Sequence, residues 1–114
     1  MMRKKIFIAV PYSGTEEEKQ IRMSKLLNYA IDIFNSGNAY ISPLILGLAL
    51  AEHGNLKTDT ETWKTFSEVL LKGCDEMHVL MLDGYEKSTG IKYELAEADK
   101  FGIKIVYISK NDLR

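Results

Sequence analysis

The sequence predicts an α/β fold in which a parallel sheet carries helices on both faces. Segments with strand character alternate with segments of helical periodicity along the chain, an order that implies right-handed crossovers between parallel strands. The apolar runs are continuous rather than alternating, which is typical of strands buried on both faces. The helical segments begin with capping residues and end at glycines.

A chain of 114 residues and 13.0 kDa has room for one domain, which we expect to span residues 1–114. A hydrophobic content of 46% allows a core and excludes a disordered chain, and the single Cys74 excludes an internal disulfide. The net charge of −1 offers no positive field for nucleic acid, and no apolar run approaches the ~20 residues of a membrane span. We therefore expect a cytoplasmic domain that acts on a small molecule, with no nucleic-acid polymer and no membrane as partner.

The first predicted elements are a strand over residues 6–10, ended by Pro11, and a long helix. Thr15 and Glu18 have the spacing of a capping box at the start of that helix, and Gly37 supplies a left-handed stop at its end. Apolar residues at helical spacing predict its buried stripe, which consists of Ile21, Leu26, Leu27, Ala30, Ile31, Ile33 and Phe34.

The middle of the chain predicts a short strand over residues 39–41 and a second amphipathic helix. Residues 44–51 between them are either a helix or an apolar loop, and residues 53–55 break this segment. Residues 58–61 repeat the capping signature. Four apolar side chains then recur at helical spacing before Gly73, namely Trp63, Phe66, Val69 and Leu70.

The last part predicts a buried strand over residues 77–82, a third helix and a final strand over residues 103–108. Ser88 opens the helix and Gly102 ends it. The ligands of such folds bind beyond the carboxyl ends of the strands. This places the functional prediction on three segments, which are residues 11–15, 42–44 and 83–94.

Residues 11–15 combine hydroxyl groups, Gly14 and a helix N-terminus. Such an end presents free backbone N–H groups to a phosphate or carboxylate. The alternative is an ordinary capped turn between a strand and a helix. The segment lacks the Gly-Lys-Ser/Thr ending of a Walker loop and the three glycines of a dinucleotide fingerprint.

Residues 88–94 contain the candidate catalytic group. Ser88 can cap the helix or donate to an anion, and Gly90 lets the backbone approach a ligand closely. Glu94 follows about one and a half turns later, where a carboxylate can attack a sugar carbon or take a proton. The alternative is that Glu94 is a solvated helix residue and Tyr93 a core side chain.

Five further residues are interpreted mainly in structural terms. Asp75 and Glu76 precede a strand and are interpreted as capping or surface groups. His53 and His78 are far apart in the sequence, so they do not indicate a metal site. Trp63 belongs either to the core or to the wall of a pocket.

A strand leads into Pro-Tyr-Ser at 11–13, a second strand leads into Ser-Pro-Leu at 42–44, and a helix begins near Trp63. A third strand ends in an Asp-led turn at Asp83, followed by the Ser-x-Gly-x-x-x-Glu element at 88–94. Together these features resemble the nucleoside 2-deoxyribosyltransferase-like superfamily over residues 5 to 108. More narrowly, they resemble its small branch with a Pro-Tyr-Ser first loop, related to deoxynucleoside 5′-monophosphate N-glycosidases.

The resemblance implies a flavodoxin-like fold and chemistry at the N-glycosidic bond of a nucleoside or nucleoside 5′-monophosphate. Glu94 matches the nucleophile that attacks the anomeric carbon, after which water or a second base releases the sugar. Ser88 and Ser13 match residues that hold the 5′-phosphate or 5′-hydroxyl, and the Trp63 helix would help enclose the base. The other residues expected at the substrate are Pro11, Tyr12, Ser42, Asp83 and Gly90. The resemblance also implies that no metal or organic cofactor is needed, and that a homodimer or larger homo-oligomer forms through helices beside the site.

The chain departs from the family pattern at three points. Where family enzymes usually have an Asp that assists the leaving base, this chain has Ser67, and where many have a Tyr it has Phe7. Some family sites are completed by a polar residue of a neighbouring subunit, for which only Ser109 and Asn111 follow the last strand. A nucleotide-binding sensor or sequestering protein without efficient catalysis is therefore a second hypothesis. A flavodoxin-like interaction domain is a third.

Overall fold

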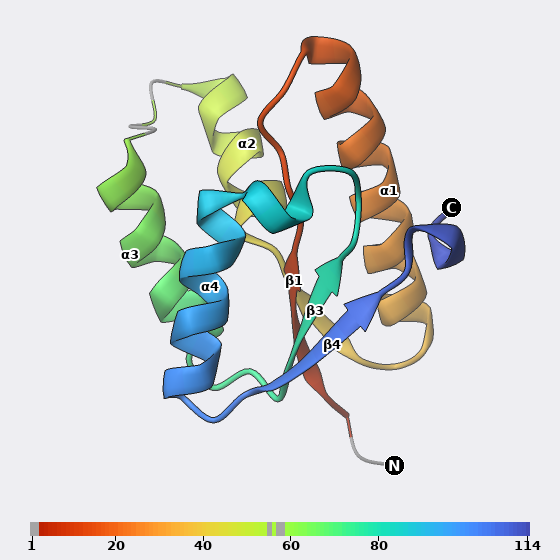
Figure 1. Ribbon diagram of the computed structural model, residues 1–114, viewed down its shortest axis with the longest axis vertical. Coiled ribbons are helices and arrows are strands. Elements are labelled where there is room, and N and C mark those ends of the chain that lie inside the picture. Colours follow the sequence, from red (N-terminus) through yellow and green to blue (C-terminus); the bar gives the residue numbers. More distant parts are fainter. Residues whose placement is uncertain (1–2, 55, 57–58) are drawn as a thin grey trace.

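The computed structural model describes residues 3–54, 56 and 59–114 and contains a four-stranded, fully parallel sheet (Figure 1). The strands are β1 (Lys5–Ala9), β2 (Ala39–Ile41), β3 (Glu76–Leu80) and β4 (Lys104–Ile108). They lie in the order β2-β1-β3-β4, so that β1 and β3 are central and β2 and β4 form the edges. The predicted α/β class is confirmed, and the arrangement is flavodoxin-like.

Helices cover both faces of this sheet (Figure 1). They are α1 (Glu16–Asn35), α2 (Pro43–His53), α3 (Thr60–Leu71) and α4 (Thr89–Lys100), with the short 3₁₀ helices η1 (Tyr85–Lys87) and η2 (Lys110–Asp112). α1 packs on one face, and α3 and α4 pack on the other. Among the described residues, no helix has both the length and the apolar character needed to cross a membrane.

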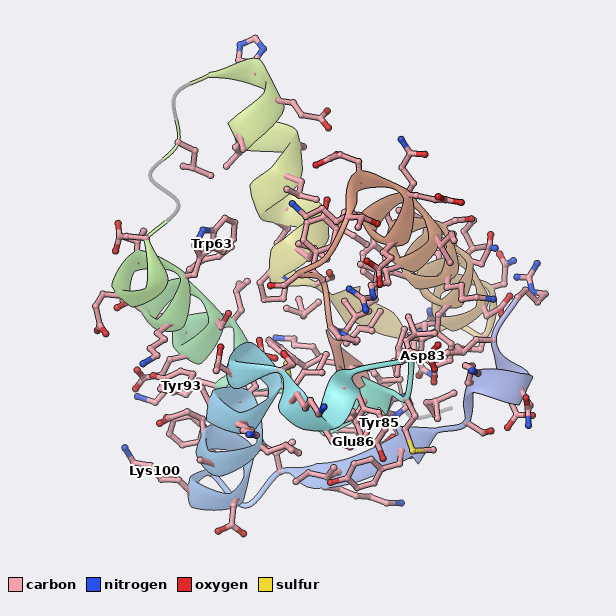
Figure 2. The ribbon with its side chains drawn as sticks, turned by 45° about the horizontal axis from the view of Figure 1, so that its top comes forward. Trp63, Asp83, Tyr85, Glu86, Tyr93 and Lys100 are labelled. Atoms are coloured by element: carbon pink, nitrogen blue, oxygen red, sulfur yellow. The ribbon has the colours of Figure 1, made fainter. Side chains whose placement is uncertain are left out.

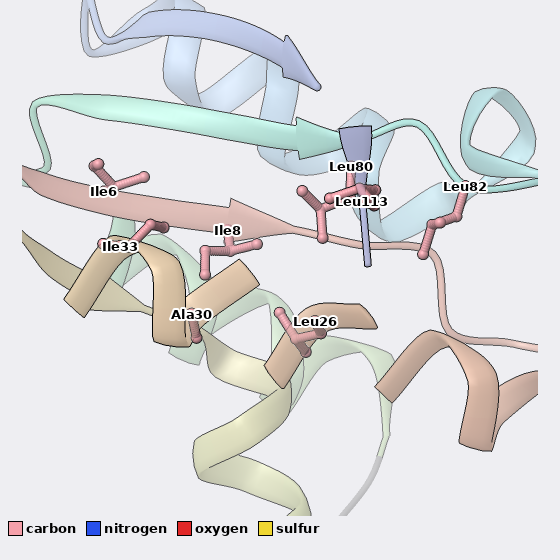
Figure 3. Close-up of a cluster of buried hydrophobic side chains, with 8 residues drawn as sticks. All are labelled: Ile6, Ile8, Leu26, Ala30, Ile33, Leu80, Leu82 and Leu113. Atoms are coloured by element: carbon pink, nitrogen blue, oxygen red, sulfur yellow. The ribbon is translucent and has the colours of Figure 1, made fainter. Parts of the chain in front are cut away.

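The central strand β1 explains why its sequence is apolar without alternation. Ile6 and Ile8 point toward α1 and belong to the cluster drawn in Figure 3. Phe7 and Ala9 point the other way, into a second cluster formed with α3 and α4. Because both faces of the strand are covered, every position from Ile6 to Ala9 is buried and none needs a polar side chain.

The helix termini follow the capping signals. The capping box of Thr15 and Glu18 forms at the start of α1, as predicted. The open question over residues 44–51 is resolved in favour of a helix, because Ser42 caps α2 and Pro43 occupies its first turn. α3 is capped by Asp59; Thr58, which the capping signature included, lies outside the described residues.

The predicted buried stripe of α1 is wrong in part. Leu26, Ala30 and Ile33 face the sheet and are buried, whereas four of the predicted residues are exposed, namely Ile21, Leu27, Ile31 and Phe34. The sheet covers only one flank of the helix, so a stripe wider than that flank cannot be buried within this chain. Phe34 is the extreme case, with 71% of its surface exposed.

The interpretation of Glu76 as a capping or surface group is also wrong. Glu76 and His78 belong to β3 and are buried, with His78 Nε2 2.7 Å from Glu76 Oε1. Lys4 Nζ lies 2.7 Å from Glu76 Oε2, and Tyr29 Oη lies 2.6 Å from His78 Nδ1. Hydrogen bonds from His78 and Lys4 hold the pKa of Glu76 at about 2. These partners explain how a strand can bury two ionisable side chains. Asp75 is an exposed surface group, and its carboxylate accepts from the backbone N–H of Lys5 at the start of β1, at 2.7 Å.

Candidate active site

A cleft of about 710 Å³ lies at the carboxyl ends of β1 and β3, the edge where ligands of parallel sheets bind. Its lining comes from the loop after β1, the first turns of α1, one side of α2 and α3, and the beginning of α4. The predicted site residues that line it are Pro11, Tyr12, Ser13, Trp63, Ser67, Ser88, Gly90 and Glu94. Segments that lie far apart in the sequence therefore meet in one cavity.

Two predicted binding residues are not part of the lining. Ser42 is only 1% exposed, and its hydroxyl accepts from the Ile45 backbone N–H at 3.2 Å, so it serves as the N-cap of α2. Its neighbours Pro43 and Leu44 do line the cleft. The Asp83 carboxylate is exposed and lies 3.0 Å from Lys110 Nζ. A residue that follows a strand thus reaches the ligand edge only if its side chain also points into the cavity.

Glu94 and Ser67 lie together where α4 packs against α3. Ser67 is buried, and the Glu94 side chain keeps part of its surface exposed. Enclosure by protein raises the pKa of Glu94 to about 8, and a hydrogen bond with the Ser67 side chain opposes part of that rise. At neutral pH about one tenth of such carboxyl groups are ionised. Perturbation of this kind in a cleft is typical of catalytic carboxyl groups.

Ser88 is the N-cap of α4, and its hydroxyl oxygen accepts from the Ile91 backbone N–H at 3.2 Å. The hydroxyl hydrogen remains free to donate into the cleft. Thr89 and Gly90 line the cleft beside it, so the helix presents its positive end to the cavity. The two alternatives for Ser88, a helix cap or an anion donor, are compatible in this geometry.

Replacing Ser88 with Ala is expected to weaken the binding of a nucleoside 5′-monophosphate by ~1–2 kcal/mol, because one charge-assisted hydrogen bond is lost. The matching nucleoside should be much less affected. Isothermal titration calorimetry with both ligands measures the difference. Ser42→Ala is the matched control, because it removes the N-cap of another helix without removing a cleft hydroxyl. Equal weakening of nucleoside and monophosphate would show that Ser88 does not contact phosphate.

The sequence reasoning missed three cations of the lining, namely Lys19, Arg22 and Lys87. Arg22 donates to the backbone carbonyls of Ser13 and, at 2.9 Å, of Asp83, so it joins the loops that follow β1 and β3. Lys19 and Arg22 follow the N-cap residue Thr15 by four and seven residues. This spacing places both side chains on the side of the helix where the cap lies. That spacing was an available signal, whereas Lys87 belongs to no such pattern.

The part of the lining that α2 supplies is apolar. Pro43, Leu44 and Leu48 of α2 line the cleft, together with Trp63 of α3. Figure 2 shows Trp63 between α3 and α2. A lining that combines an aromatic side chain and aliphatic groups with cations and hydroxyls suits a ligand with a planar apolar part and an anionic part.

A second, smaller concavity of about 200 Å³ lies between α3 and α4, and we call it the α3–α4 groove. It shares five lining residues with the cleft, which are Trp63, Ser67, Thr89, Gly90 and Glu94, and it adds Lys64 and Tyr93. Lys64 Nζ lies 5.2 Å from the centre of the Tyr93 ring, and Tyr93 Oη donates to Glu68 Oε2 at 3.3 Å. Tyr93 is thus a partly buried surface residue rather than a core side chain.

Comparison with known proteins adds a family but no activity. A family model described as Domain of unknown function (DUF1937) matches residues 4–110, nearly the whole chain. No curated protein matches the sequence. The chemistry of the cleft must therefore be judged from its residues.

Proposed function

Because this chain belongs to the DUF1937 family, which carries no assigned activity, we propose its function from the cleft. We propose that the protein cleaves or transfers the N-glycosidic bond of a nucleoside or nucleoside 5′-monophosphate, with Glu94 as nucleophile. The observation that carries the proposal is the position of the Glu94 carboxyl group, which lines a cleft at the ligand edge of the sheet together with Trp63 and Ser88. Because its pKa is raised to about 8, the attacking carboxylate is fully formed only above neutral pH.

The composition of the walls supports this substrate class. Ser13, Lys87 and Ser88 offer hydroxyl and cationic donors for a 5′-phosphate or 5′-hydroxyl. Trp63 offers an aromatic face for a base. Glu94 follows Ser88 on the same helix and lines both concavities together with Trp63, so a sugar that joins phosphate and base would pass near its carboxylate.

In the proposed reaction, a carboxylate oxygen of Glu94 attacks the anomeric carbon as the bond to the base nitrogen breaks. The electron pair of that bond leaves with the base, which then takes up a proton from water. The resulting glycosyl ester is cleaved by water in hydrolysis or by a second base in transfer, and the Glu94 carboxylate is regenerated. None of these steps requires a metal or organic cofactor.

The second candidate function is nucleotide binding without efficient catalysis. One observation favours it. Ser67 lies beside Glu94, at the position where the resemblance to the nucleoside 2-deoxyribosyltransferase-like superfamily leads us to expect an Asp. A serine hydroxyl is a weak general acid. The cavity and its cations would then serve a sensor or a sequestering protein.

The direct test is to incubate the protein with a panel of deoxynucleosides and deoxynucleoside 5′-monophosphates and to measure free base by chromatography. The enzyme hypothesis expects one or more substrates to release base with the wild type and not with Glu94→Gln. Nucleotide binding without any base release would favour the sensor or sequestering protein. Absence of both would favour the third hypothesis, a flavodoxin-like interaction domain.

If Glu94 is the nucleophile, kcat/KM should rise about tenfold for each pH unit up to about pH 8 and then level off. Only the ionised carboxylate attacks, and its pKa is about 8. Ser67→Ala should move the midpoint to higher pH, because the Ser67 hydrogen bond lowers the pKa of Glu94. A profile that is flat between pH 5 and 8 would contradict ionisation of Glu94 as the controlling step.

We further propose that the protein forms a homodimer or larger homo-oligomer. α2 carries no charged residue before Glu52, yet Leu46 and Leu50 are 45% and 58% exposed. A helix that is apolar all round is normally buried. Light scattering at tens of micromolar should therefore show a species larger than 13 kDa, and Leu50→Glu should shift it toward the monomer. Val69→Glu, on an exposed site of α3, is the control; a wild-type species of 13 kDa would contradict the proposal.

A further inference from the structure

Gly47 of α2 lies directly against the indole of Trp63. A Cβ atom placed on Gly47 would lie 1.8 Å from Trp63 Cη2 and 2.3 Å from Cζ3. Both distances are far inside van der Waals contact, so no larger residue fits while the indole stays in place. Gly47 is buried, and its backbone forms the surface on which the indole rests.

Phe66 also packs against the indole. The Phe66 ring packs edge-on, with its centre 6.0 Å from that of Trp63 and an interplanar angle of 73°. Trp63 lines both the cleft and the α3–α4 groove, and it shares each lining with Ser67 and Glu94. The backbone of α2 at Gly47 therefore sets how far the indole stands from the carboxyl group.

We propose that Gly47 is a specificity-determining positioning residue that sets the size of the planar group the cleft accepts. Without a side chain at this position the indole lies back against α2 (Figure 2), which leaves space in front of it for a base. This inference rests on the proposed function, because it takes the planar group to be the base of a nucleotide.

The proposal gives a direction for each substitution. Gly47→Ala pushes the indole away from α2 and into the space it lines, so a bicyclic purine should lose more affinity than a monocyclic pyrimidine. Trp63→Phe removes the outer ring atoms that the new Cβ would meet, and should favour the purine. In the double variant Gly47→Ala/Trp63→Phe the clash is absent, so the preference should return toward that of the wild type.

The experiment measures Kd for dGMP and dCMP by calorimetry in the wild type, both single variants and the double variant. We expect Gly47→Ala to weaken dGMP at least tenfold more than dCMP, the scale on which an apolar pocket discriminates one methylene group. Gly54→Ala is the matched control, because a Cβ at Gly54 meets no atom within 4 Å; it should leave both constants unchanged. The double-mutant cycle isolates the contact between the two residues.

The possible outcomes separate this inference from the proposed function. If Gly47→Ala does not fold, Trp63→Phe alone must still change the ratio of the two constants, and an unchanged ratio would overturn the inference. If the wild type releases base but the ratio of the two constants is the same in every variant, the inference is overturned and the enzyme hypothesis stands. A changed ratio without base release would support the inference and overturn only catalysis. Failure of the wild type to bind either nucleotide would overturn both.

Discussion

Glu94→Gln should lower base release by at least ~10³-fold, because the amide keeps the size of the side chain but cannot form the glycosyl ester. Nucleotide binding should survive, since the substitution leaves the cations and the serine hydroxyls of the lining unchanged. At pH 9, where Glu94 of the wild type is mostly ionised, binding of a monophosphate should even tighten in the variant, because a carboxylate no longer repels the phosphate. Chromatographic measurement of free base, combined with calorimetry on the same samples, separates the two effects.

A second measurement on Glu94→Gln does not depend on turnover. The pKa of Glu94 is raised from 4.5 to about 8, so the folded state binds a proton that the unfolded chain releases between these pH values. This proton uptake makes the free energy of unfolding depend on pH. The contribution from Glu94 is fully present below pH 4.5 and is lost as the pH rises through 8. The glutamine variant should lack this loss and gain stability relative to wild type at pH 9. Asp99→Asn, at an exposed position of the same helix outside the cleft lining, is the control. Unchanged turnover in Glu94→Gln would make Glu94 an ordinary helix residue.

Ser67→Asp should raise base release by ~10²-fold or more, because a carboxylic acid beside the reaction centre can protonate the leaving base. Two carboxyl groups at this contact should share a proton, since the charge on one raises the pKa of the other. A proton is then held next to the bond that breaks. Single-turnover measurements near pH 6 provide the test.

Ser24→Asp provides the matched control, because it adds the same charge at an exposed position of α1 outside the cleft lining. If base release is absent from the wild type and stays absent in Ser67→Asp while nucleotides still bind, the enzyme hypothesis fails. The nucleotide-binding hypothesis then takes its place.

Much of the fold could be predicted because the decisive signals are local. Continuous apolar runs placed β1 and β3 within one or two residues of their ends, and Thr15 placed the start of α1. The width of the buried stripe of α1 could not be predicted, because it depends on how much of the helix the sheet covers. Glu76 was misjudged for a related reason. Only the folded chain brings Lys4 and His78 to it, and without them a buried carboxylate is unfavourable.

The candidate site shows the same division. Eight predicted residues line the cleft. Six of them follow β1 or β3, whose carboxyl ends meet at one edge of the sheet, and Trp63 and Ser67 reach the cleft from α3. Ser42 and Asp83 lie at the correct strand ends, but one points into a helix cap and the other into solvent. The role of Arg22 depends on two backbone carbonyls from different loops, which no sequence spacing reveals.

The order of strands in the sheet also has a consequence for how the chain acquires its structure. β1 comes first in the chain, β2 adds to one of its edges, β3 adds to the other, and β4 adds to the free edge of β3. In the described sheet each strand thus joins an open edge, and none has to insert between two strands that are already paired. Assembly can therefore follow the direction of synthesis. Both β2 and β3 pair directly with β1 and take their register from it. A destabilising substitution in β1 should therefore slow every later step of folding, whereas one in β4 should slow only the last.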